Sequence, residues 1–492
     1  MLRSSAITGG AQLINIATSL IRMKAAAVLM GPTGVGLVGL YSNVIQTMAS
    51  VASLGMANAG TRQIAAAHAA GGDLAVGRIR RALFWATLAL SLIGAALFWL
   101  ASGWVARVIL ADGARAPQVA WLSIGVALSV ATGYQVALLT GLRRVGDLAR
   151  ITIGAGLVGT VFGVGALLIW GDAGLLGMVL VAPAVTLAFG HVFVVRLGLG
   201  TDHAMRLHEM AKELRDLARL GLTFMLSSVV TLLSHLAARM LVQHELGPEA
   251  LGQFQAAWTI SMTYLGFVLG AMSTDFYPRL TAAIDDPKKA CRLVNEQTEV
   301  ALLLCAPVLL ALLGCAPWVI RLLYSPEFGP AIDILRWQLL GDILKLLSWP
   351  MGFVILARGA GKTFLLTESL GMVALLAAIW IGIPLVGVTA TGIAFLAMYG
   401  VYLPLVWGLS GRMIGFRWSR SVTWQALAII SAAILVVITS RIFDPAGAAL
   451  GLILALAFSL WALLRLSLQA EAEGRLGQIA RAAERIMHWM KR

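Results

Sequence analysis

The most constraining feature of this chain is a series of apolar runs, each about as long as a lipid bilayer is thick. A helix needs about 20 mostly apolar residues to cross a hydrocarbon core of about 30 Å. Short polar breaks separate the runs, which lie near residues 5–30, 37–58, 82–103, 117–140, 150–170, 174–196, 219–243, 250–278, 294–314, 331–356, 363–382, 386–409, 422–441 and 446–468. They predict an all-α integral membrane protein with about 14 transmembrane helices.

Composition agrees with a membrane protein. Only 12% of the 492 residues are charged, against about 25% in soluble domains. The net charge of +14 would suggest nucleic acid in a soluble protein, but these cations lie between apolar runs. We therefore expect them to signal orientation and to contact lipid headgroups, with no nucleic-acid partner. The cysteines Cys291, Cys305 and Cys315 have no metal-ligand spacing, so no metal site is predicted.

The basic residues are concentrated on one side of the predicted membrane. With the N-terminus inside, 28 of the 37 Lys and Arg residues fall in inside segments and five in outside segments. Cytoplasmic loops carry such an excess. Both termini are thus predicted to be cytoplasmic. The stretch from Met1 to Met30 is expected to be the first membrane helix rather than a removed signal peptide.

A repeat divides the chain. Gly31-Pro32 recurs as Gly247-Pro248, each after an apolar run, and Arg62 recurs as Arg279 at almost the same spacing. The period spans six runs, and an even number makes the repeats parallel. We predict an N-lobe over 1–200 (helices 1–6), a C-lobe over 201–412 (helices 7–12), and a C-terminal helix pair with a basic amphipathic tail over 413–492. Transporters built from repeats bind substrate between them and alternate access; two unrelated turns are the alternative.

Four of the 37 Lys and Arg residues belong to neither the inside nor the outside segments: Arg22, Lys24, Arg239 and Lys345. A charge at a helix centre costs about 2.5–3.5 kcal/mol on insertion scales. Arg22 continues a polar stripe with Gln12, Asn15 and Ser19, whereas Lys24 lies on the opposite face. Snorkelling to the membrane surface is the alternative role for Arg22, Arg239 and, above all, Lys24.

The seventh run repeats this pattern with His235 and Arg239, and the repeat period relates Arg239 to Arg22. In the tenth run, Asp342 and Lys345 share a face near mid-helix. They are interpreted either as a pair that only packs, or as part of a binding site. In such a site Lys345 would bind the substrate phosphate when substrate is present, and would pair with Asp342 when the site is empty. A cavity with excess cations favours an anionic substrate, and arginine suits phosphate. No nucleotide-binding loop is present.

Two segments resemble a known family. Lys24-Ala25-Ala26-Ala27-Val28-Leu29-Met30-Gly31-Pro32-Thr33-Gly34-Val35-Gly36-Leu37 is similar to the first-helix signature of O-antigen flippases. Trp337-Gln338-Leu339-Leu340-Gly341-Asp342-Ile343-Leu344-Lys345 is similar to the tenth-helix segment of lipid III flippases, and it is the more specific of the two. The chain therefore resembles the polysaccharide-export flippases of the multidrug/oligosaccharidyl-lipid/polysaccharide superfamily, over roughly residues 1–410.

The resemblance implies a V-shaped transporter of the bacterial cytoplasmic (inner) membrane, whose two lobes enclose a cationic cavity. Its substrate and partner would be an undecaprenyl-pyrophosphate-linked oligosaccharide, with membrane lipids and other glycan assembly proteins as further partners. No cofactor is expected; coupling to an H⁺ or Na⁺ gradient stays open. The expected substrate-binding residues are Arg22, Lys24, Arg62, Arg239, Arg279, Asp342 and Lys345, and no catalytic residue is predicted.

Alternatives remain. A lipid II flippase also has fourteen helices. A multidrug antiporter of the same superfamily would need net acidic residues within the membrane. A membrane-embedded glycan polymerase would need a larger outer loop than this sequence offers. The compact flippases lack this C-terminal helix pair, and the sequence does not indicate a function for it.

Overall fold

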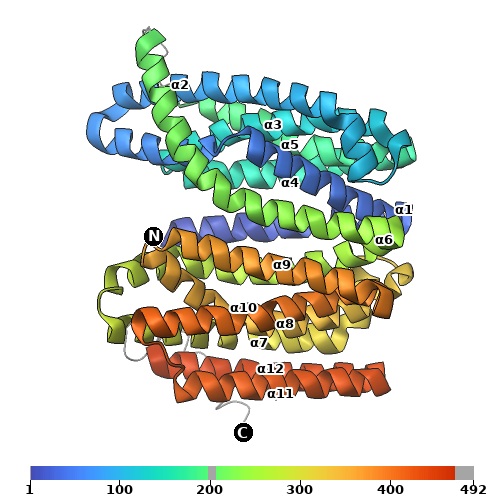
Figure 1. Cartoon of the computed structure of the whole chain (residues 1–492). Coiled ribbons are helices and arrows are strands. Elements are labelled where there is room, and N and C mark those ends of the chain that lie inside the picture. Colours follow the sequence, from blue (N-terminus) through green and yellow to red (C-terminus); the bar gives the residue numbers. More distant parts are fainter. Residues whose placement is uncertain (1, 198–206, 471–492) are drawn as a thin grey trace. The chain divides into compact units, whose positions relative to one another are not determined.

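The computed structural model describes residues 2–197 and 207–470 (Figure 1). Within these ranges the chain consists of α-helices joined by short turns and 3₁₀ segments, with no strand. Residues 471–492 of the expected basic tail lie outside the described residues. The all-helical class predicted from the apolar runs is confirmed.

The chain divides into two compact units. Unit 1 comprises Met1–Ala256 and Leu323–Phe328, and unit 2 comprises Ala257–Leu322 and Gly329–Arg492. This division follows packing, whereas the predicted lobes follow the sequence repeat, so the lobe boundaries stay predictions.

Unit 1 is built from five helices and the first part of a sixth. These are α1 (Leu2–Ala52), α2 (Met56–Val108), α3 (Ala116–Gly141), α4 (Val145–Trp170), α5 (Gly174–Val195) and α6 (Leu207–Ala283), with 3₁₀ segments η1 (Gly113–Arg115), η2 (Gly171–Ala173) and η3 (Pro326–Phe328). Within this unit α2 packs on α3, α4 packs on α5, and α1 packs on α4.

Unit 2 contains the end of α6 and the remaining helices. They are α7 (Pro287–Leu323), α8 (Gly329–Ala357), α9 (Gly361–Val386), α10 (Ala390–Ile414), α11 (Arg420–Ile442) and α12 (Asp444–Ala470), with η4 (Gly387–Thr389) before α10. Here α10 packs against both α8 and α9, and α11 packs against α12 and α8.

Two helices are broken at the repeated Gly-Pro pairs. Gly31 interrupts α1 with φ 62° and ψ −162°, and Gly247 interrupts α6 with φ 84° and ψ 179°. Glycine tolerates this positive φ, and the proline that follows cannot donate a backbone hydrogen bond to the preceding turn. Each long helix therefore consists of two separate segments that meet at its Gly-Pro pair.

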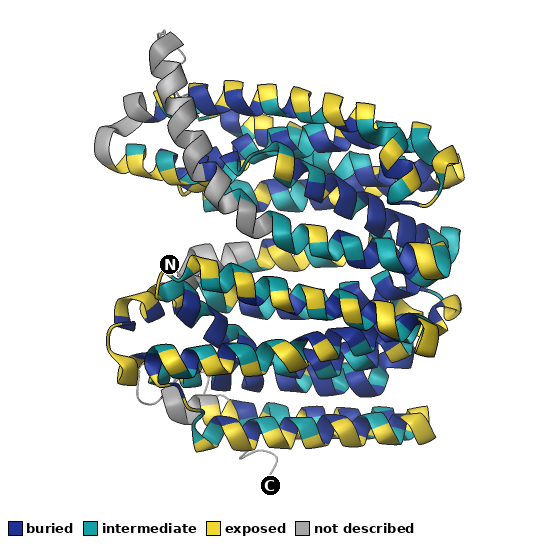
Figure 2. Cartoon of the chain, viewed as in Figure 1, coloured by how far each residue is buried: buried dark blue, intermediate teal, exposed yellow. Residues whose placement is uncertain are grey.

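The helices are suited to a membrane. In the described part of the chain, ten segments are long and apolar enough to cross one. Four of these segments are 44–54 residues long, more than twice the length that one crossing needs. Their outward surfaces expose large apolar side chains such as Trp99, Trp380 and Trp424, while polar groups such as Asp342 are buried. Figure 2 shows exposed and buried positions along the same helices. The protein is a multi-pass membrane protein, and the count of fourteen crossings stays a prediction.

Candidate functional site

Unit 1 encloses a polar cavity of about 390 Å³ next to the first intramembrane arginine. The two segments of α1 supply Ser19, Arg22, Ser42 and Gln46, α3 supplies Ser129, and the rest of the wall is largely apolar side chains of α1 and α5. Ser19 and Arg22 are one helical turn apart, so they share a helix face. The part of the predicted polar stripe that contains Ser19 and Arg22 therefore faces a cavity.

The Arg22 guanidinium is half-buried and available for a ligand. No hydrogen bond or ion pair joins this side chain to any residue that the structure describes. A buried charge without a partner is expensive, and an arginine fork is suited to phosphate oxygens. The geometry therefore fits an anion in this cavity.

A second cavity of unit 1, of about 230 Å³, shares Gln46 and Ser129 with the first. It runs between α1, α2 and α3 and is lined by further small hydroxyls and by Tyr134. The Tyr134 hydroxyl accepts a hydrogen bond of 3.2 Å from Arg80 Nε. Hydroxyl and amide groups thus extend from the Arg22 cavity toward a second arginine.

Lys24 does not line the Arg22 cavity. Its ammonium donates to the backbone oxygen of Tyr324, a fully buried residue that packs against Phe328. This position agrees with the helical geometry that separates Lys24 from Arg22. Lys24 links the first helix to the 323–328 segment of unit 1.

Arg239 is 4% exposed and held in place by several contacts. Its Nε donates to Gln255 Oε1 at 3.1 Å, its Nη1 donates to the His235 carbonyl at 3.0 Å, and its guanidinium lies over the Phe254 ring at 5.8 Å. Unlike Arg22, it does not line a cavity described above. Arg22 and Arg239, which the repeat period relates to each other, therefore have different surroundings.

Two other predicted site residues lie on exposed helix surfaces. Arg62 is exposed on α2. Arg279 is exposed on α6 and forms an ion pair of 3.0 Å with Asp275, one turn earlier. The structure does not bring either residue into the cavities.

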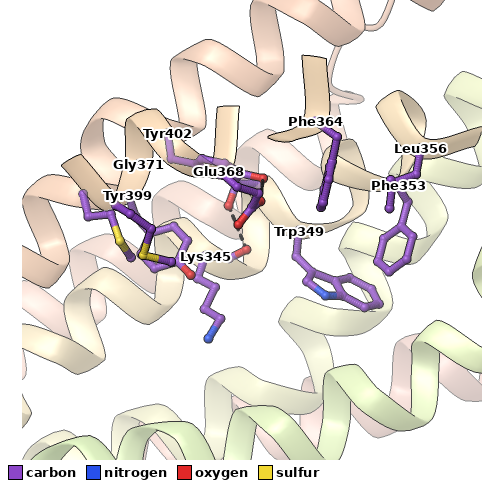
Figure 3. A pocket seen from close by; sticks show the side chains of 13 residues that line it. Lys345, Trp349, Phe353, Leu356, Phe364, Glu368, Gly371, Tyr399 and Tyr402 are labelled. Carbon is purple, nitrogen blue, oxygen red and sulfur yellow. Dashed lines mark hydrogen bonds between the residues drawn. The ribbon is translucent and has the colours of Figure 1, made fainter. Parts of the chain in front are cut away.

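Unit 2 contains a cavity of about 200 Å³ between α8, α9 and α10. One stripe of α8 lines it, and the spacing of these residues follows helical periodicity: Lys345, Ser348, Trp349, Gly352, Phe353 and Leu356. The opposing helices contribute Phe364, Glu368, Gly371, Met372, Met398, Tyr399 and Tyr402. Figure 3 shows Trp349, Phe353 and Phe364 on one side and Lys345, Tyr399 and Tyr402 on the other.

The cavity contains one cation and one carboxylate. Lys345 Nζ donates to Met262 Sδ at 3.4 Å and lies about 6 Å from the ring centres of Phe395 and Tyr399. Glu368 Oε1 accepts a 2.5 Å hydrogen bond from the Tyr402 hydroxyl. Lys345 and Glu368 form no ion pair with each other within the described part of the chain.

Asp342 lies apart from this cavity. It is fully buried, and its Oδ2 accepts hydrogen bonds from Ser261 Oγ at 2.8 Å and from the Tyr264 hydroxyl at 2.9 Å. The predicted pairing of Asp342 with Lys345 in an empty site does not occur here. Hydroxyl donors from α6 bind Oδ2 of the carboxylate instead, whereas its Oδ1 has no hydrogen-bond partner within the described part of the chain.

Sequence reasoning missed Glu368 and the tyrosines. Glu368 is the one acidic residue of α9, and a carboxylate within a membrane segment is itself a signal of a functional or paired group. Tyr399 and Tyr402 carry no such signal, because aromatic residues are common in apolar runs. For metals, no group of three His, Cys, Asp or Glu residues comes together in the described ranges.

Comparison with known proteins gives matches in sequence and in fold. Residues 26–333 match a family described as "Polysaccharide biosynthesis protein". The chain is 24% identical over 412 residues to the lipid III flippase of Escherichia coli (strain K12), covering 83% of this chain and 98% of that one. The relative from Shigella flexneri matches to the same extent.

In fold, the chain is similar to a structure of the lipid II flippase MurJ in an inward closed conformation. The TM-score is 0.69 with 11% identity, covering 96% of this chain and 99% of that one. An inward-facing multidrug resistance MATE family transporter of the MOP superfamily gives a TM-score of 0.63 with 16% identity, covering 88% and 99%. These likenesses concern the fold alone.

Proposed function

Because this chain belongs to the family of polysaccharide biosynthesis proteins, we propose that it is a flippase for lipid-linked oligosaccharide. The substrate would be an undecaprenyl-pyrophosphate-linked repeat unit of O-antigen, common antigen or exopolysaccharide. The protein moves it across the bacterial cytoplasmic membrane by alternating access. Its sequence relative named lipid III flippase is matched over 98% of its length, and this supports a transporter rather than an enzyme.

One observation carries the proposal: Arg22 faces a hydroxyl-lined cavity inside an apolar helix bundle without a partner among the described residues. A membrane protein keeps such a charge at a cost of several kcal/mol, so a functional role offsets that cost. Pyrophosphate offers oxygens in a geometry that guanidinium binds with two parallel hydrogen bonds. The neighbouring serines and Gln46 would bind remaining oxygens or the first sugar.

Reciprocal contacts in unit 1 support two parallel six-helix repeats. A Cβ on Gly36 would lie 2.8 Å from the Pro248 oxygen, and a Cβ on Gly252 would overlap the Pro32 oxygen. Each glycine thus packs against the proline of the other Gly-Pro pair, and the two partner positions are related by the repeat period. Equivalent residues contact each other in this way around a two-fold axis. The proposed lobes are 1–200 and 201–412, followed by the helix pair of 413–492.

The proposal also includes the orientation of the protein in the membrane and the energy source for transport. Both termini are cytoplasmic, because the excess of Lys and Arg falls on that side. An H⁺ or Na⁺ gradient would drive the cycle, since the sequence has no nucleotide-binding loop. Membrane lipids surround the prenyl chain, and other glycan assembly proteins deliver and consume the substrate.

Two other transport functions compete with this proposal. A lipid II flippase is favoured by the fold shared with MurJ. A multidrug antiporter of the same superfamily is favoured by the second fold match and by Glu368 in the unit 2 cavity. A cationic drug would be repelled by Arg22 and Lys345, so this function ranks below the flippase. A glycan polymerase ranks last.

Purified protein in liposomes tests the proposal. Lipid-linked oligosaccharide is placed in one leaflet, and its appearance in the other is followed with an impermeant glycosidase. Wild type is expected to move the substrate without lengthening it. Longer glycan products would instead identify a polymerase, and drug uptake without glycan movement would identify an antiporter.

In cells, Lys345→Ala and Arg239→Ala are expected to abolish glycan export at normal membrane abundance. Arg107→Ala is the control, because that arginine is exposed and its Nε donates to a carbonyl of its own helix, that of Gly103, at 3.1 Å. Wild-type export by both test variants would assign these residues to packing. Complementation of strains that lack defined flippases identifies the glycan.

A further inference from the structure

The unit 2 cavity has a size that fits one small ring. At about 200 Å³ it is smaller than the roughly 300–1,000 Å³ of pockets for drug-sized ligands. Gly352 and Gly371 both border Tyr402, where an added Cβ would lie 3.3 Å from the hydroxyl or the ring. Glycine at these two positions therefore lets the Tyr402 side chain pack closely between α8 and α9 at the edge of the cavity.

The polar groups of this cavity have unused hydrogen-bonding capacity. Glu368 accepts one hydrogen bond, from Tyr402, although a carboxylate accommodates about four. Lys345 donates to a thioether, a weak acceptor, and has three donors. Burying such groups unsatisfied costs free energy, so a ligand with both donors and acceptors is favoured. An isoprenoid chain would leave both charges unsatisfied.

The other side of the cavity is a flat aromatic surface. Trp349 stacks against Phe276 at a centroid distance of 6.2 Å and meets the edge of Phe353 at 4.8 Å. These contacts hold the indole in place while it borders the cavity with Phe364 (Figure 3). Aromatic faces carry partial negative charge and attract weakly positive C–H groups. A ring with C–H groups on its face and hydroxyls at its edge matches both sides of the cavity.

We propose that this cavity binds one neutral pyranose ring of the transported glycan. The ring's C–H face stacks on Trp349, one hydroxyl donates to Glu368, and another oxygen accepts from Lys345. The cavity's single cation and single carboxylate balance each other, so a uronic acid or a free amino sugar would add an uncompensated charge. This inference rests on the proposed function and assigns glycan selection to unit 2, separately from the pyrophosphate site at Arg22.

Methyl glycosides of glucose, N-acetylglucosamine, galactose, mannose and rhamnose are the probes for a direct test. Full-length protein in nanodiscs is titrated with each, and saturation-transfer NMR reports which ring protons contact the protein. At least one glycoside is expected to bind through its axial C–H face. Trp349→Ala and Glu368→Gln should each weaken its binding about tenfold or more, which corresponds to about 1.4 kcal/mol.

Matched controls separate local effects from misfolding. Trp380→Ala removes an indole that is 66% exposed on α9, and Glu299→Gln changes a buried carboxylate that contacts Ser421 and Gln425 instead of the cavity. Both should bind the glycoside as wild type does. Glu368→Gln preserves shape, so it decides the case if Trp349→Ala does not fold.

Three outcomes overturn the inference: no glycoside binds wild type, the cavity variants bind as the controls do, or farnesol displaces the glycoside and so identifies a lipid-tail site. If instead the proposed flippase function is wrong, the experiments give a different result. In that case wild type binds no farnesyl pyrophosphate and moves no lipid-linked glycan, whatever the glycoside titration gives.

Discussion

Arg22 and Arg239 occupy matching positions in the proposed sequence repeat, yet their environments assign them different roles. Arg22 faces a cavity without a partner among the described side chains, whereas Arg239 donates to Gln255 and to a carbonyl of its own helix. A group that binds substrate keeps free donors. An arginine that also stabilises the fold, as Arg239 does, uses its N–H donors in hydrogen bonds within the protein.

Replacing each arginine by methionine is expected to separate these roles, because methionine retains a long apolar stem. Arg239→Met leaves Gln255 Oε1 without this donor and should lower the free energy of unfolding by about 1.5–3 kcal/mol. Arg22→Met should change it by less than about 1 kcal/mol, but abolish binding of farnesyl pyrophosphate. Denaturant unfolding in detergent and a binding titration measure the two effects. Equal destabilisation by both variants would contradict the assignment.

The sequence predicted some site residues better than others, for physical reasons. Helical periodicity placed Arg22 on a polar face, and the structure places that face on a cavity. Periodicity also separated Lys24 from Arg22, as observed, whereas the family resemblance pointed to Lys24 as a substrate residue. Glu368 escaped prediction because its cavity forms only when α8, α9 and α10 pack together, and no local pattern encodes that packing.

At the scale of elements, polar contacts attach the C-terminal helix pair, α11 and α12, to the other helices of unit 2. Arg336, on α8, is 8% exposed and pairs with Asp444 at 2.7 Å at the start of α12. Glu299 on α7 accepts hydrogen bonds from Ser421 and Gln425 on α11, at 3.0 and 2.9 Å. The sequence alone does not show that α12 begins beside Arg336, because the two residues of this pair are 108 positions apart.

Asp444→Asn is expected to loosen this attachment. The buried Arg336 guanidinium would lose its close counter-charge, and we expect the free energy of unfolding to fall by about 1–3 kcal/mol. Asp333→Asn is the matched control, because Asp333 is 55% exposed and lies 3.8 Å from the same guanidinium. Its effect should stay within about 0.5 kcal/mol. Equal losses for the two variants, measured by denaturant unfolding in detergent, would show that Asp444 has no special role.

At the scale of the whole molecule, hydropathy predicted the all-helical membrane class, and the motif resemblance to polysaccharide-export flippases is confirmed by the family match. The number of membrane crossings is harder to predict from the sequence, because a long helix such as α6 can cross the membrane once or twice. The break at Gly247 divides it into two segments. Which side of the membrane each loop occupies depends on that count.

Cysteine labelling in intact cells tests this count and the orientation together. Asp172 in η2 and Lys288 at the start of α7 are both exposed, and α5 and α6 lie between them. If α5 crosses once and α6 twice, these positions lie on opposite sides. In a background in which Cys291, Cys305 and Cys315 are replaced by alanine, an impermeant maleimide should label Asp172→Cys and leave Lys288→Cys unlabelled until the cells are opened. Labelling of both from outside would mean that α6 crosses once, and the reverse pattern would place the termini outside.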